Sequence, residues 1–567
     1  MAHRRRTTAR LVISGLLLVT LACAPAATAA SRPTSLPAAG SDERLQFMSE
    51  TVSVHKWARD PSSAPTAELR QQFRAIKRAR AKVRAAPATP AGAATVQSLL
   101  SNLAFTGDTH GLPQNEESVT TCRNDSTKVL GGTNDFRGLL LPGFTGWHYS
   151  SSGGVSLTKE GGLPNLPGAV PSQGDPVAAS NGQCTLYMSS LNFNDTKTQV
   201  GLYRTTPAAL AAAACAPNAN GATRADPDCW PTRRAVMSGS TSSVFYDKEW
   251  TDAGASGSAG NVVWTAATRY SGDPGSSQIK AVRCNGALTV CSNEILISDP
   301  ADSDFAHGNK FTQFSHVEIG DSGRTYISWV AVKIDPDTGD QTFTVKVKSA
   351  APGSTVFGPS KVVATLHNAV PLGGYLAADS FAVATMPQMT SKQVSSTDER
   401  VYVSYEVCQA IKLGGLCYGP QAKLARFDVN PASGATGPIA TTLVSVPGAA
   451  SNYFTSVNAD PLQPKLAMVY YTNRVDPFDH RQAVELATVN LAGGVTQRQL
   501  VSPVNEPDAD PFLQGSFIGD YIEVAPRDGV ALTHYNANFL KKVFLPTMPP
   551  AGPPVNQQDN FLSRATY

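Results

Sequence analysis

Hydrophobic and polar residues alternate with a period of two over much of the chain after residue 100, and this pattern predicts β-strands. Seven times an apolar strand leads through a turn with Gly, Asn or Asp into a second strand that ends in an aromatic or small residue. The second strands are expected at 128–134, 186–190, 261–265, 325–329, 401–405, 466–471 and 530–535.

Further strands complete these modules. Third strands are expected at 200–204, 279–283, 343–347 and 483–487, and short fourth strands at 294–297, 361–364, 442–446 and 499–501. Equivalent markers recur every 60 to 73 residues: Asn115, Asp175, Asp247, Phe314, Phe381, Phe454 and Phe517. Repeated units of four strands predict a β-propeller, because one small sheet buries both faces only against neighbouring sheets. Seven modules favour seven blades, and six would result if one module were split or decorated the edge.

The first hundred residues follow a different pattern. Residues 1–30 combine a basic start, an apolar run over Leu11–Cys23 and small residues at Ala27-Thr28-Ala29, which predicts a secretory signal peptide. The apolar run is shorter than the ~20 residues of a membrane span. Lipid anchoring at Cys23 is the alternative, although Thr20 stands where Leu is usual. Residues 31–99 are expected to form a helical lead-in and an Ala/Pro linker before the propeller at 100–567.

The cysteine count agrees with export. After Cys23 the chain has eight cysteines, an even number that predicts disulfides in an exported protein. Three pairs are close in sequence, Cys215–Cys229, Cys284–Cys291 and Cys408–Cys417, and Cys122–Cys184 is left by elimination. No Cys-x2-Cys spacing occurs, so zinc is disfavoured.

The charge distribution excludes several classes of partner. The chain carries a net charge of +3, but residues 100–567 contain 32 basic and 39 acidic side chains, so the predicted propeller is acidic. A nucleic-acid-binding role is therefore not expected. No run after the signal is long and apolar enough for a membrane span, and a monomer is expected.

Five motifs follow one another over roughly residues 110–545: Asn134–Gly138, Gly146–Ser150, Gly174–Val177, Asp247–Trp250 and Gly515–Tyr521. Together they resemble the secreted bacterial sialidase-like propellers with BNR (Asp-box) repeats. Two frames keep part of the Asp-box, Ser150/Gly154/Ser156 with Ser152 in place of Asp, and Ser349/Gly353/Thr355 with Ala351 in place of Asp. The Phe-Arg-Ile-Pro motif of true sialidases is absent. The resemblance implies a propeller that acts on a carbohydrate.

In a propeller, the loops before the inner strands and the loops after the second strands lie on one face, around the channel. The first set supplies Asp175, Asp247, Glu249, His316, Glu318, Asp379 and Asp520; the second supplies Asp135, Arg137, Arg269, Tyr270, Tyr405, Glu406, Arg474, Asp476, His534 and Tyr535.

Three arginines, Arg137, Arg269 and Arg474, occupy equivalent module positions, and converging guanidinium groups would suit a carboxylate ligand. The alternative is that each arginine braces its own loop. As further substrate contacts we consider Trp250 and Asp520, although Asp520 also suits a structural role as a hydrogen-bond acceptor that closes a blade.

A glycosidase also needs an acid and a nucleophile or base. The candidates are Asp135, Asp247 and Glu249, together with a Tyr405–Glu406 pair that would imitate a sialidase tyrosine and its glutamate. Neighbours on a strand point to opposite faces, so that pair requires an irregular loop. Asp247 and Glu249 have a structural alternative, which is to tie blades together through backbone donors.

Three functions remain open: a secreted glycoside hydrolase acting on a carbohydrate, with an acidic glycan among the candidate substrates; a non-catalytic propeller that binds glycan or protein at the cell surface; and a polysaccharide lyase with a Tyr or His base. No cofactor is expected. The acidic run at 335–340 has spacing that partly suits a structural Ca²⁺ loop, but the order of Asp and Gly is swapped and the usual downstream Glu is missing, so a turn is favoured.

Overall fold

The protein is described by a computed structural model. It describes residues 98–567 except for 100–101, 141, 218–223, 273–275, 304–308, 336, 339, 372–373, 380, 413–415, 508, 511, 514–516 and 545–552, and it also describes Asp60, Ser62, Arg70, Gln71, Phe73 and Arg74. The predicted signal peptide and most of the predicted lead-in lie outside these residues. Among the helices described, none is long and apolar enough to cross a membrane.

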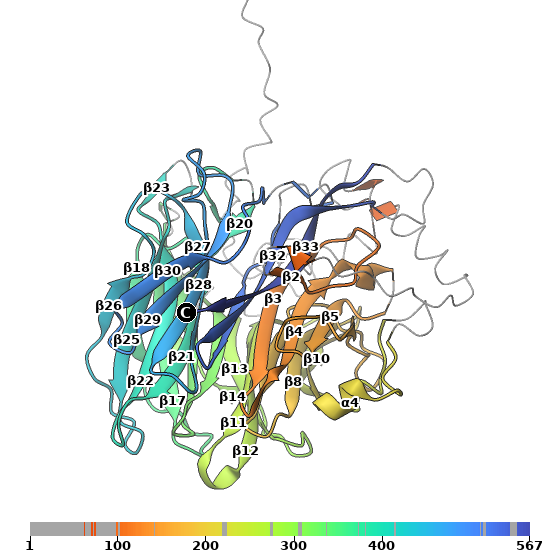
Figure 1. The fold of residues 1–567 in the computed structure, drawn as a ribbon. Coiled ribbons are helices and arrows are strands. Elements are labelled where there is room, and N and C mark those ends of the chain that lie inside the picture. The colour runs from red at the N-terminus through yellow and green to blue at the C-terminus, as the bar shows by residue number, and fades with distance from the viewer. Residues whose placement is uncertain are drawn as a thin grey trace, which may run out of the picture. The chain divides into compact units, whose positions relative to one another are not determined.

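Seven antiparallel sheets form a seven-bladed β-propeller, as the module count predicts (Figure 1). Blades 1–3 follow in chain order, each with its inner strand at the axis. Blade 1 consists of β3 (Gln114–Cys122), β4 (Asp125–Asp135), β5 (Thr145–Ser150) and β6 (Lys159–Gly162). Blade 2 consists of β7 (Val177–Ser180), β8 (Leu186–Phe193), β9 (Lys197–Thr205) and β10 (Thr232–Ser240). Blade 3 consists of β11 (Val244–Ala255), β12 (Asn261–Ser271), β13 (Ser276–Asn285) and β14 (Ile295–Leu296).

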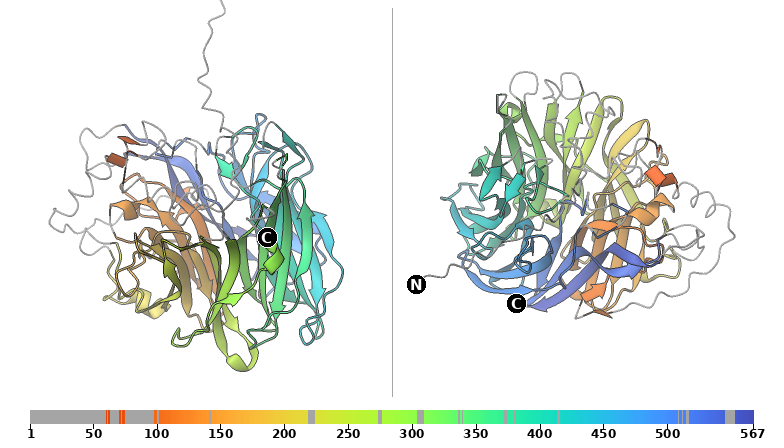
Figure 2. Two further views of the ribbon diagram at one scale, coloured as in Figure 1. Left: turned by 180° about the vertical axis from the view of Figure 1, so that it is seen from behind. Right: turned by 90° about the horizontal axis from the view of Figure 1, so that it is seen from above.

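Blades 4–6 repeat the same order around the axis, as the view from above shows (Figure 2). Blade 4 consists of β15 (Lys310–Ile319), β16 (Thr325–Ile334), β17 (Gln341–Ala350) and β18 (Lys361–Leu366). Blade 5 consists of β21 (Gln388–Gln393), β22 (Glu399–Val407), β25 (Gln421–Val429) and β26 (Ala440–Leu443). Blade 6 consists of β27 (Asn452–Ala459), β28 (Lys465–Thr472), β29 (Ala483–Asn490) and β30 (Val495–Leu500).

Blade 7 joins the two ends of the described chain. Its order is β31 (Glu523–Arg527), β32 (Val530–Lys542), β33 (Val555–Thr566), β2 (Asn102–Ala104) and β1 (Ser98–Leu99). Figure 1 shows β2 lying beside β33. The ring is therefore closed by strands from both ends of this part of the sequence. The predicted second strands lie within the observed ones, whereas β33, β1 and β2 were not predicted.

Small elements decorate the blades. Two short sheets, β19 (Gly374–Tyr375) with β20 (Ala382–Val383) and β23 (Ala410–Lys412) with β24 (Leu416–Tyr418), accompany blade 5. The inserted β19–β20 sheet explains why Phe381 is a poor marker, since the inner strand of blade 5 begins only at Gln388. The loops also hold helix α4 (Pro207–Ala211) and the 3₁₀ turns η2 (Phe136–Leu139), η3 (Gly257–Ala259) and η4 (Pro300–Asp302).

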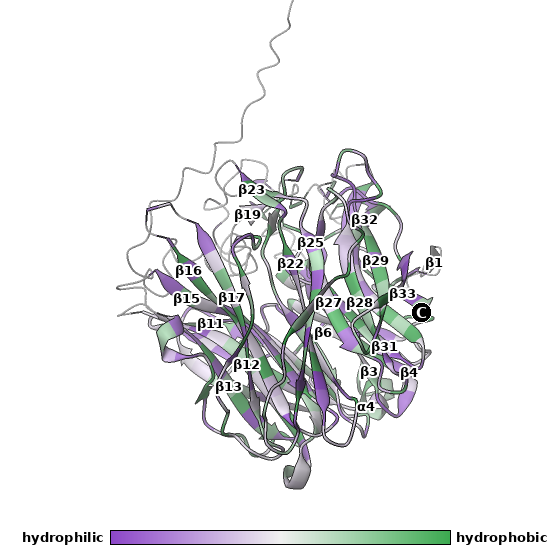
Figure 3. Cartoon of the chain, turned by 90° about the vertical axis from the view of Figure 1, so that its left-hand side faces the viewer, coloured by the Kyte–Doolittle hydropathy of each residue, from purple (hydrophilic) through white to green (hydrophobic). Residues whose placement is uncertain are grey.

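The core lies between blades rather than inside one compact centre. Apolar and polar positions alternate along the strands (Figure 3), so each blade presents apolar residues to its neighbours. One large cluster spans blades 2–5 and includes the buried rings of Trp250, Trp264 and Trp329. Phe73, from the predicted lead-in helix, is also fully buried and packs edge-on against Phe512 at 5.3 Å.

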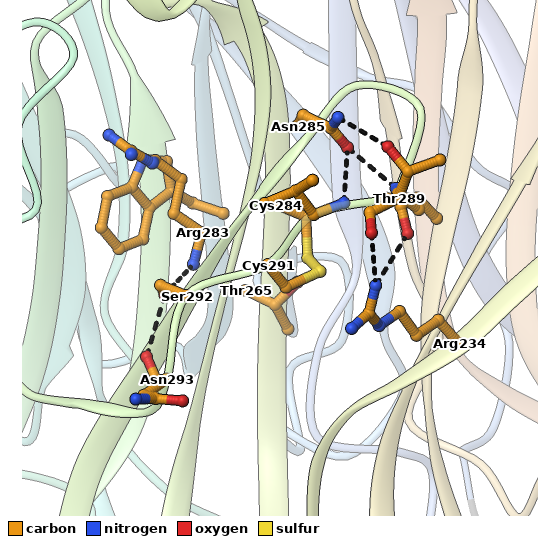
Figure 4. Close-up of a disulfide and its surroundings, with 12 residues drawn as sticks. Arg234, Thr265, Arg283, Cys284, Asn285, Thr289, Cys291, Ser292 and Asn293 are labelled. Carbon is orange, nitrogen blue, oxygen red and sulfur yellow. Dashed lines mark hydrogen bonds between the residues drawn. A yellow bond between two sulfur atoms is a disulfide. The ribbon is translucent and has the colours of Figure 1, made fainter.

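All four predicted disulfides are present: Cys122–Cys184, Cys215–Cys229, Cys284–Cys291 and Cys408–Cys417. Figure 4 shows the Cys284–Cys291 disulfide, which closes the hairpin after β13. Beside it, the Asn285 side chain forms hydrogen bonds with Thr289, and the Arg234 guanidinium donates one to the Thr289 carbonyl. Four disulfides are typical of proteins that fold outside the reducing cytosol.

Both altered Asp-box frames lie directly after a third strand. Ser150 ends β5, and its hydroxyl accepts hydrogen bonds from the Ser152 and Gly154 amides, while Ser152 and Ser156 share a hydrogen bond of 2.9 Å. The second frame begins at Ser349, at the end of β17. The turn at 335–340 closes the β16–β17 hairpin, with the Asp335 carboxylate accepting from the backbone of Asp337 and Thr338. In the described part of the chain, no group of three or more His, Cys, Asp or Glu is arranged to hold a metal ion.

Candidate functional site at the channel mouth

The inner strands carry an unusual backbone feature where they begin. Five non-glycine residues at this level have positive φ: Glu116, Asp175, Lys248, Phe314 and Phe454. In four of these blades, strand pairing shifts by one residue at the same place, which makes a β-bulge. Bulges re-aim side chains, and such strained backbone gathers at functional sites. The repeated bulge therefore defines a ring of special positions at the channel mouth.

Lys248 lies at the centre of this ring. Its Nζ is 2.7 Å from Glu116 Oε1, 2.6 Å from Asp520 Oδ2 and 3.3 Å from Asp175 Oδ2. The Tyr521 ring lies 5.5 Å from the same ammonium. Residues of blades 1, 2 and 3 and of the loop that leads into blade 7, before β31, thus meet at one cation. We call Lys248, Glu116, Asp175, Asp520 and Glu249 the mouth cluster.

Gly519 allows the loop before β31 to approach the mouth cluster. It has φ +93°, and a Cβ at this position would lie 2.8 Å from the backbone nitrogen of Glu116. Neither the dihedral nor the spacing suits a larger residue. The Gly519-Asp520-Tyr521 sequence therefore places a carboxylate and an aromatic ring against Lys248.

Burial sets the protonation of the mouth cluster. Loss of solvent, with the nearby Asp175 charge, raises the pKa of Glu116 and of Glu249 well above the usual value. Burial alone would lower the pKa of Lys248, but Asp175, Asp520 and Glu116 outweigh it and raise that pKa. The cluster thus places two carboxyl groups with raised pKa values, Glu116 and Glu249, beside an ammonium that stays charged. Proton donors and acceptors of this kind are what general acid–base chemistry needs.

Access to the cluster is limited. Glu116, Asp175, Lys248 and Glu249 are buried, whereas the side chain of Asp520 is 22% exposed. Among the described residues, no side chain hydrogen-bonds to the Glu249 carboxyl oxygens. Asp520 is therefore the member that solvent or a ligand reaches first.

The channel continues inward from this cluster. Trp250 stacks on His316 at 4.4 Å and meets Tyr521 edge-on at 5.6 Å. Next to this aromatic layer lies a cavity of about 110 Å³ lined by all seven inner strands. Burial raises the pKa of Glu523 to about 8 and lowers that of His316 to about 3.

Carboxylates of this inner channel connect adjacent blades. Asp252 accepts a hydrogen bond of 2.7 Å from the Ile319 amide, and Glu318 accepts one of 2.8 Å from the Ser391 amide. Glu523 accepts one of 2.7 Å from the Val119 amide. These three carboxyl groups tie adjacent blades through backbone donors, the kind of role that the sequence also suggested for Asp247 and Glu249.

The three arginines each have a carboxylate partner within their own blade. Arg137 pairs with Asp135 at 2.7 Å and Glu160 at 2.9 Å in blade 1. Arg269 lies 3.9 Å from Glu294 in blade 3, and Arg474 lies 2.5 Å from Glu485 in blade 6. The structure therefore shows each arginine bracing its own blade, with no contact between any two of them among the described residues.

Asp135 belongs to a buried ionic network in blade 1. Its carboxylate caps η2 and contacts both Arg137 and Arg224, the latter at 2.6 Å. Burial would raise the pKa of Asp135, but the two guanidinium groups outweigh it and lower that pKa to about 2. An acid held ionised in this way acts as a structural anion.

Tyr405 and Glu406 lie within the regular strand β22 and point to opposite faces. Tyr405 lines a hollow beside β18 together with Leu366, whereas Glu406 contacts Thr455 of blade 6 at 3.3 Å. The structure does not bring them together as a nucleophile and its base.

Glu406 nevertheless makes a testable electrostatic prediction. Burial raises its pKa to about 8, so the folded state keeps a proton that the unfolded chain releases above its ordinary pKa near 4.5. The resulting destabilisation grows from about pH 4.5 and levels off above pH 8. Glu406→Gln should therefore raise the free energy of unfolding by roughly 2–4 kcal/mol at pH 8.5 and by much less at pH 5.

Urea unfolding at the two pH values measures this difference. Glu506→Gln is the matched control, because it makes the same change of side chain at an exposed position. An equal gain for Glu406→Gln at both pH values would contradict the raised pKa.

Comparisons with known proteins give fold-level likeness only. No protein-family model and no curated protein matches the chain. A Hadza microbial sialidase aligns with 10% identity and a TM-score of 0.38, covering 69% of this chain and 65% of its own. The α-L-arabinanase of Penicillium chrysogenum aligns with 10% identity and a TM-score of 0.40, covering 70% of this chain and 99% of the arabinanase. The polysaccharide lyase Uly1 aligns with 9% identity and a TM-score of 0.39, covering 66% of this chain and 78% of the lyase. This chain thus spans about two thirds of the sialidase, and none of these values carries an argument about function.

Proposed function

We propose that this chain is an exported glycoside hydrolase of the sialidase-like propeller kind, acting on a carbohydrate at the mouth cluster. The observation that carries the proposal is the convergence of Asp175, Glu249 and Asp520, all expected from the sequence on the channel face, around Lys248. The sialidase-like motifs of the sequence support the same substrate class.

The roles follow from protonation and access. Glu249, protonated because it is buried, is the candidate general acid. Asp520, beside the ammonium and partly exposed, is the candidate base or nucleophile. Glycoside hydrolysis uses one carboxyl group of each kind. Trp250 and Tyr521 supply the aromatic layer beneath them.

A second candidate is a non-catalytic propeller that binds glycan or protein at the cell surface. The specific observation in its favour is that Lys248 already contacts three carboxyl groups and that most of the cluster is buried. In that case the mouth cluster has a structural role and holds blades 1, 2, 3 and 7 together.

A panel of sialosides, arabinans and other plant and microbial glycans tests the proposal. We expect release of reducing sugar from at least one glycan, and a loss of about 100-fold or more in kcat for Asp520→Asn and Glu249→Gln. Asp228→Asn is the matched control, because Asp228 is exposed on blade 2. Thermal melting confirms that each variant is folded.

The other outcomes separate the alternatives. Glycan binding without product would favour the binding propeller, and unsaturated products that absorb in the ultraviolet would indicate a lyase. Full turnover in both variants would remove the mouth cluster from the reaction.

A further inference from the structure

A second concave surface lies between blades 4 and 5, away from the channel. It encloses about 720 Å³ and is lined by parts of β16, β17, β18 and β25 and by the turn at 432–436. Arg324 directly precedes β16 and Lys361 opens β18. In an antiparallel blade, the second and fourth strands begin at the end opposite the start of the inner strand. The blade 4–5 groove therefore lies toward the end of the propeller that is opposite the mouth cluster.

The charge of this groove contrasts with that of the propeller around it. Its lining contains three cations, Arg324, Lys348 and Lys361, and no Asp or Glu. Residues 100–567 as a whole carry more acidic than basic side chains. A local positive surface on an acidic domain attracts anionic ligands to that place.

Two of these cations form no ion pair with any residue that the structure describes. Arg324 is buried and donates to neutral acceptors, the Pro431 carbonyl at 2.8 Å and the Ser349 hydroxyl at 3.1 Å. Lys361 lies 5.4 Å from the centre of the Phe427 ring. Among the described residues, neither side chain forms an ion pair, whereas Lys348 is paired with Asp299 at 2.7 Å. A buried cation without a counter-ion is costly, so an anion in the groove would be stabilising.

Uncharged parts of the lining suit a sugar. Val356 and Val362 are 78% and 47% exposed and give the groove an accessible apolar surface. The half-buried Phe357 adds an aromatic ring, and hydroxyl groups come from Ser349, Ser360, Ser433 and Thr436. Apolar faces with a few placed polar groups and a volume of this size are typical of small-ligand sites.

We propose that the blade 4–5 groove is an auxiliary binding site for an acidic oligosaccharide, whose carboxylate or sulfate groups meet Arg324 and Lys361. Its aromatic and aliphatic side chains would contact the sugar faces. The site needs no catalysis at the mouth cluster and would hold a charged glycan on the opposite end of the same propeller.

Calorimetric titration of the full chain with tetragalacturonate, and with neutral maltotetraose for comparison, tests this site. We expect binding of the uronate alone, weakening as salt rises, because an ion pair at a surface groove is screened. Lys361→Glu should raise the Kd at least about tenfold, the effect of losing one charged contact worth about 1.4 kcal/mol. Lys361 is a half-buried surface residue, so this variant should fold.

Matched variants distinguish the groove from the channel. Lys197→Glu makes the same charge change at an exposed position on blade 2 and should bind like wild type. Asp520→Asn should also keep uronate binding, so failure of the mouth-cluster proposal would leave this result unchanged. The proposal is overturned if wild type does not bind tetragalacturonate, if maltotetraose binds equally well, or if Lys361→Glu binds normally. Equal, Lys361-dependent binding of poly-glutamate would assign the groove to acidic peptides instead.

Discussion

Lys248→Met should destabilise the propeller by about 3–5 kcal/mol at pH 7, because it removes the single cation that contacts three buried or half-buried carboxyl groups. Methionine keeps the length and packing of the side chain, so the effect isolates the charge. Without the ammonium, the carboxyl groups of the mouth cluster lose the positive charge that offsets their removal from water.

The destabilisation caused by Lys248→Met should depend on pH. Burial raises the pKa of Glu116 and the Lys248 charge lowers it, so loss of Lys248 raises that pKa further. A carboxyl group with a raised pKa destabilises the folded state increasingly above the ordinary carboxyl pKa. The difference between wild type and Lys248→Met should therefore be largest at neutral pH and shrink toward pH 4. Urea midpoints at pH 4, 5.5 and 7 measure it.

Two further variants make the test specific. Asp175→Asn in the Lys248→Met background should restore part of the stability, because it removes one of the unpaired charges. Lys197→Met, at an exposed position, should change stability by less than about 0.5 kcal/mol. If Lys248→Met also fell in that small range, the mouth cluster would not be held by its charge.

The propeller and its blade number follow from local sequence patterns. Alternating strands, turn residues and a module period are short-range features, so the strands at 186–190, 261–265 and 325–329 were predicted within β8, β12 and β16. The four disulfides followed from cysteine spacing and elimination. The inserted β19–β20 sheet broke the spacing, and this is why Phe381 does not mark the inner strand of blade 5.

The candidate site was only partly visible in the sequence. Asp175, Glu249 and Asp520, which the sequence put on one face, lie around Lys248, but Lys248 itself was overlooked although it stands between Asp247 and Glu249. Aligning the modules on the bulge would have found it, since Glu116 occupies the same position in blade 1. The ionic network around Arg137 could not be predicted from the sequence, because the Arg137–Glu160 and Arg224–Asp135 ion pairs depend on long-range packing.

Loss of the N-terminal strands should have the largest effect on folding. A chain that begins at residue 106 lacks β1 and β2 and the buried side chains of Leu103 and Phe105, whereas one that begins at residue 98 keeps them. Within blade 7, Leu103 pairs with Leu562, and Asn102 accepts a hydrogen bond of 2.7 Å from the Tyr535 hydroxyl. Burial of the two apolar side chains alone contributes on the order of 5 kcal/mol, comparable to the whole stability of many domains.

We therefore expect the chain from residue 98 to unfold cooperatively on heating and the chain from residue 106 to be largely unfolded or aggregated at 37 °C. Unpaired edges favour aggregation, and the shorter chain leaves β33 as an exposed edge strand. Calorimetry and size-exclusion chromatography of the two chains measure the difference. Adding a peptide of residues 98–106 to the shorter chain should restore part of the transition, because the missing strands can pair with β33 from solution. Equal melting of the two truncated chains would show that the C-terminal strands close the ring without them.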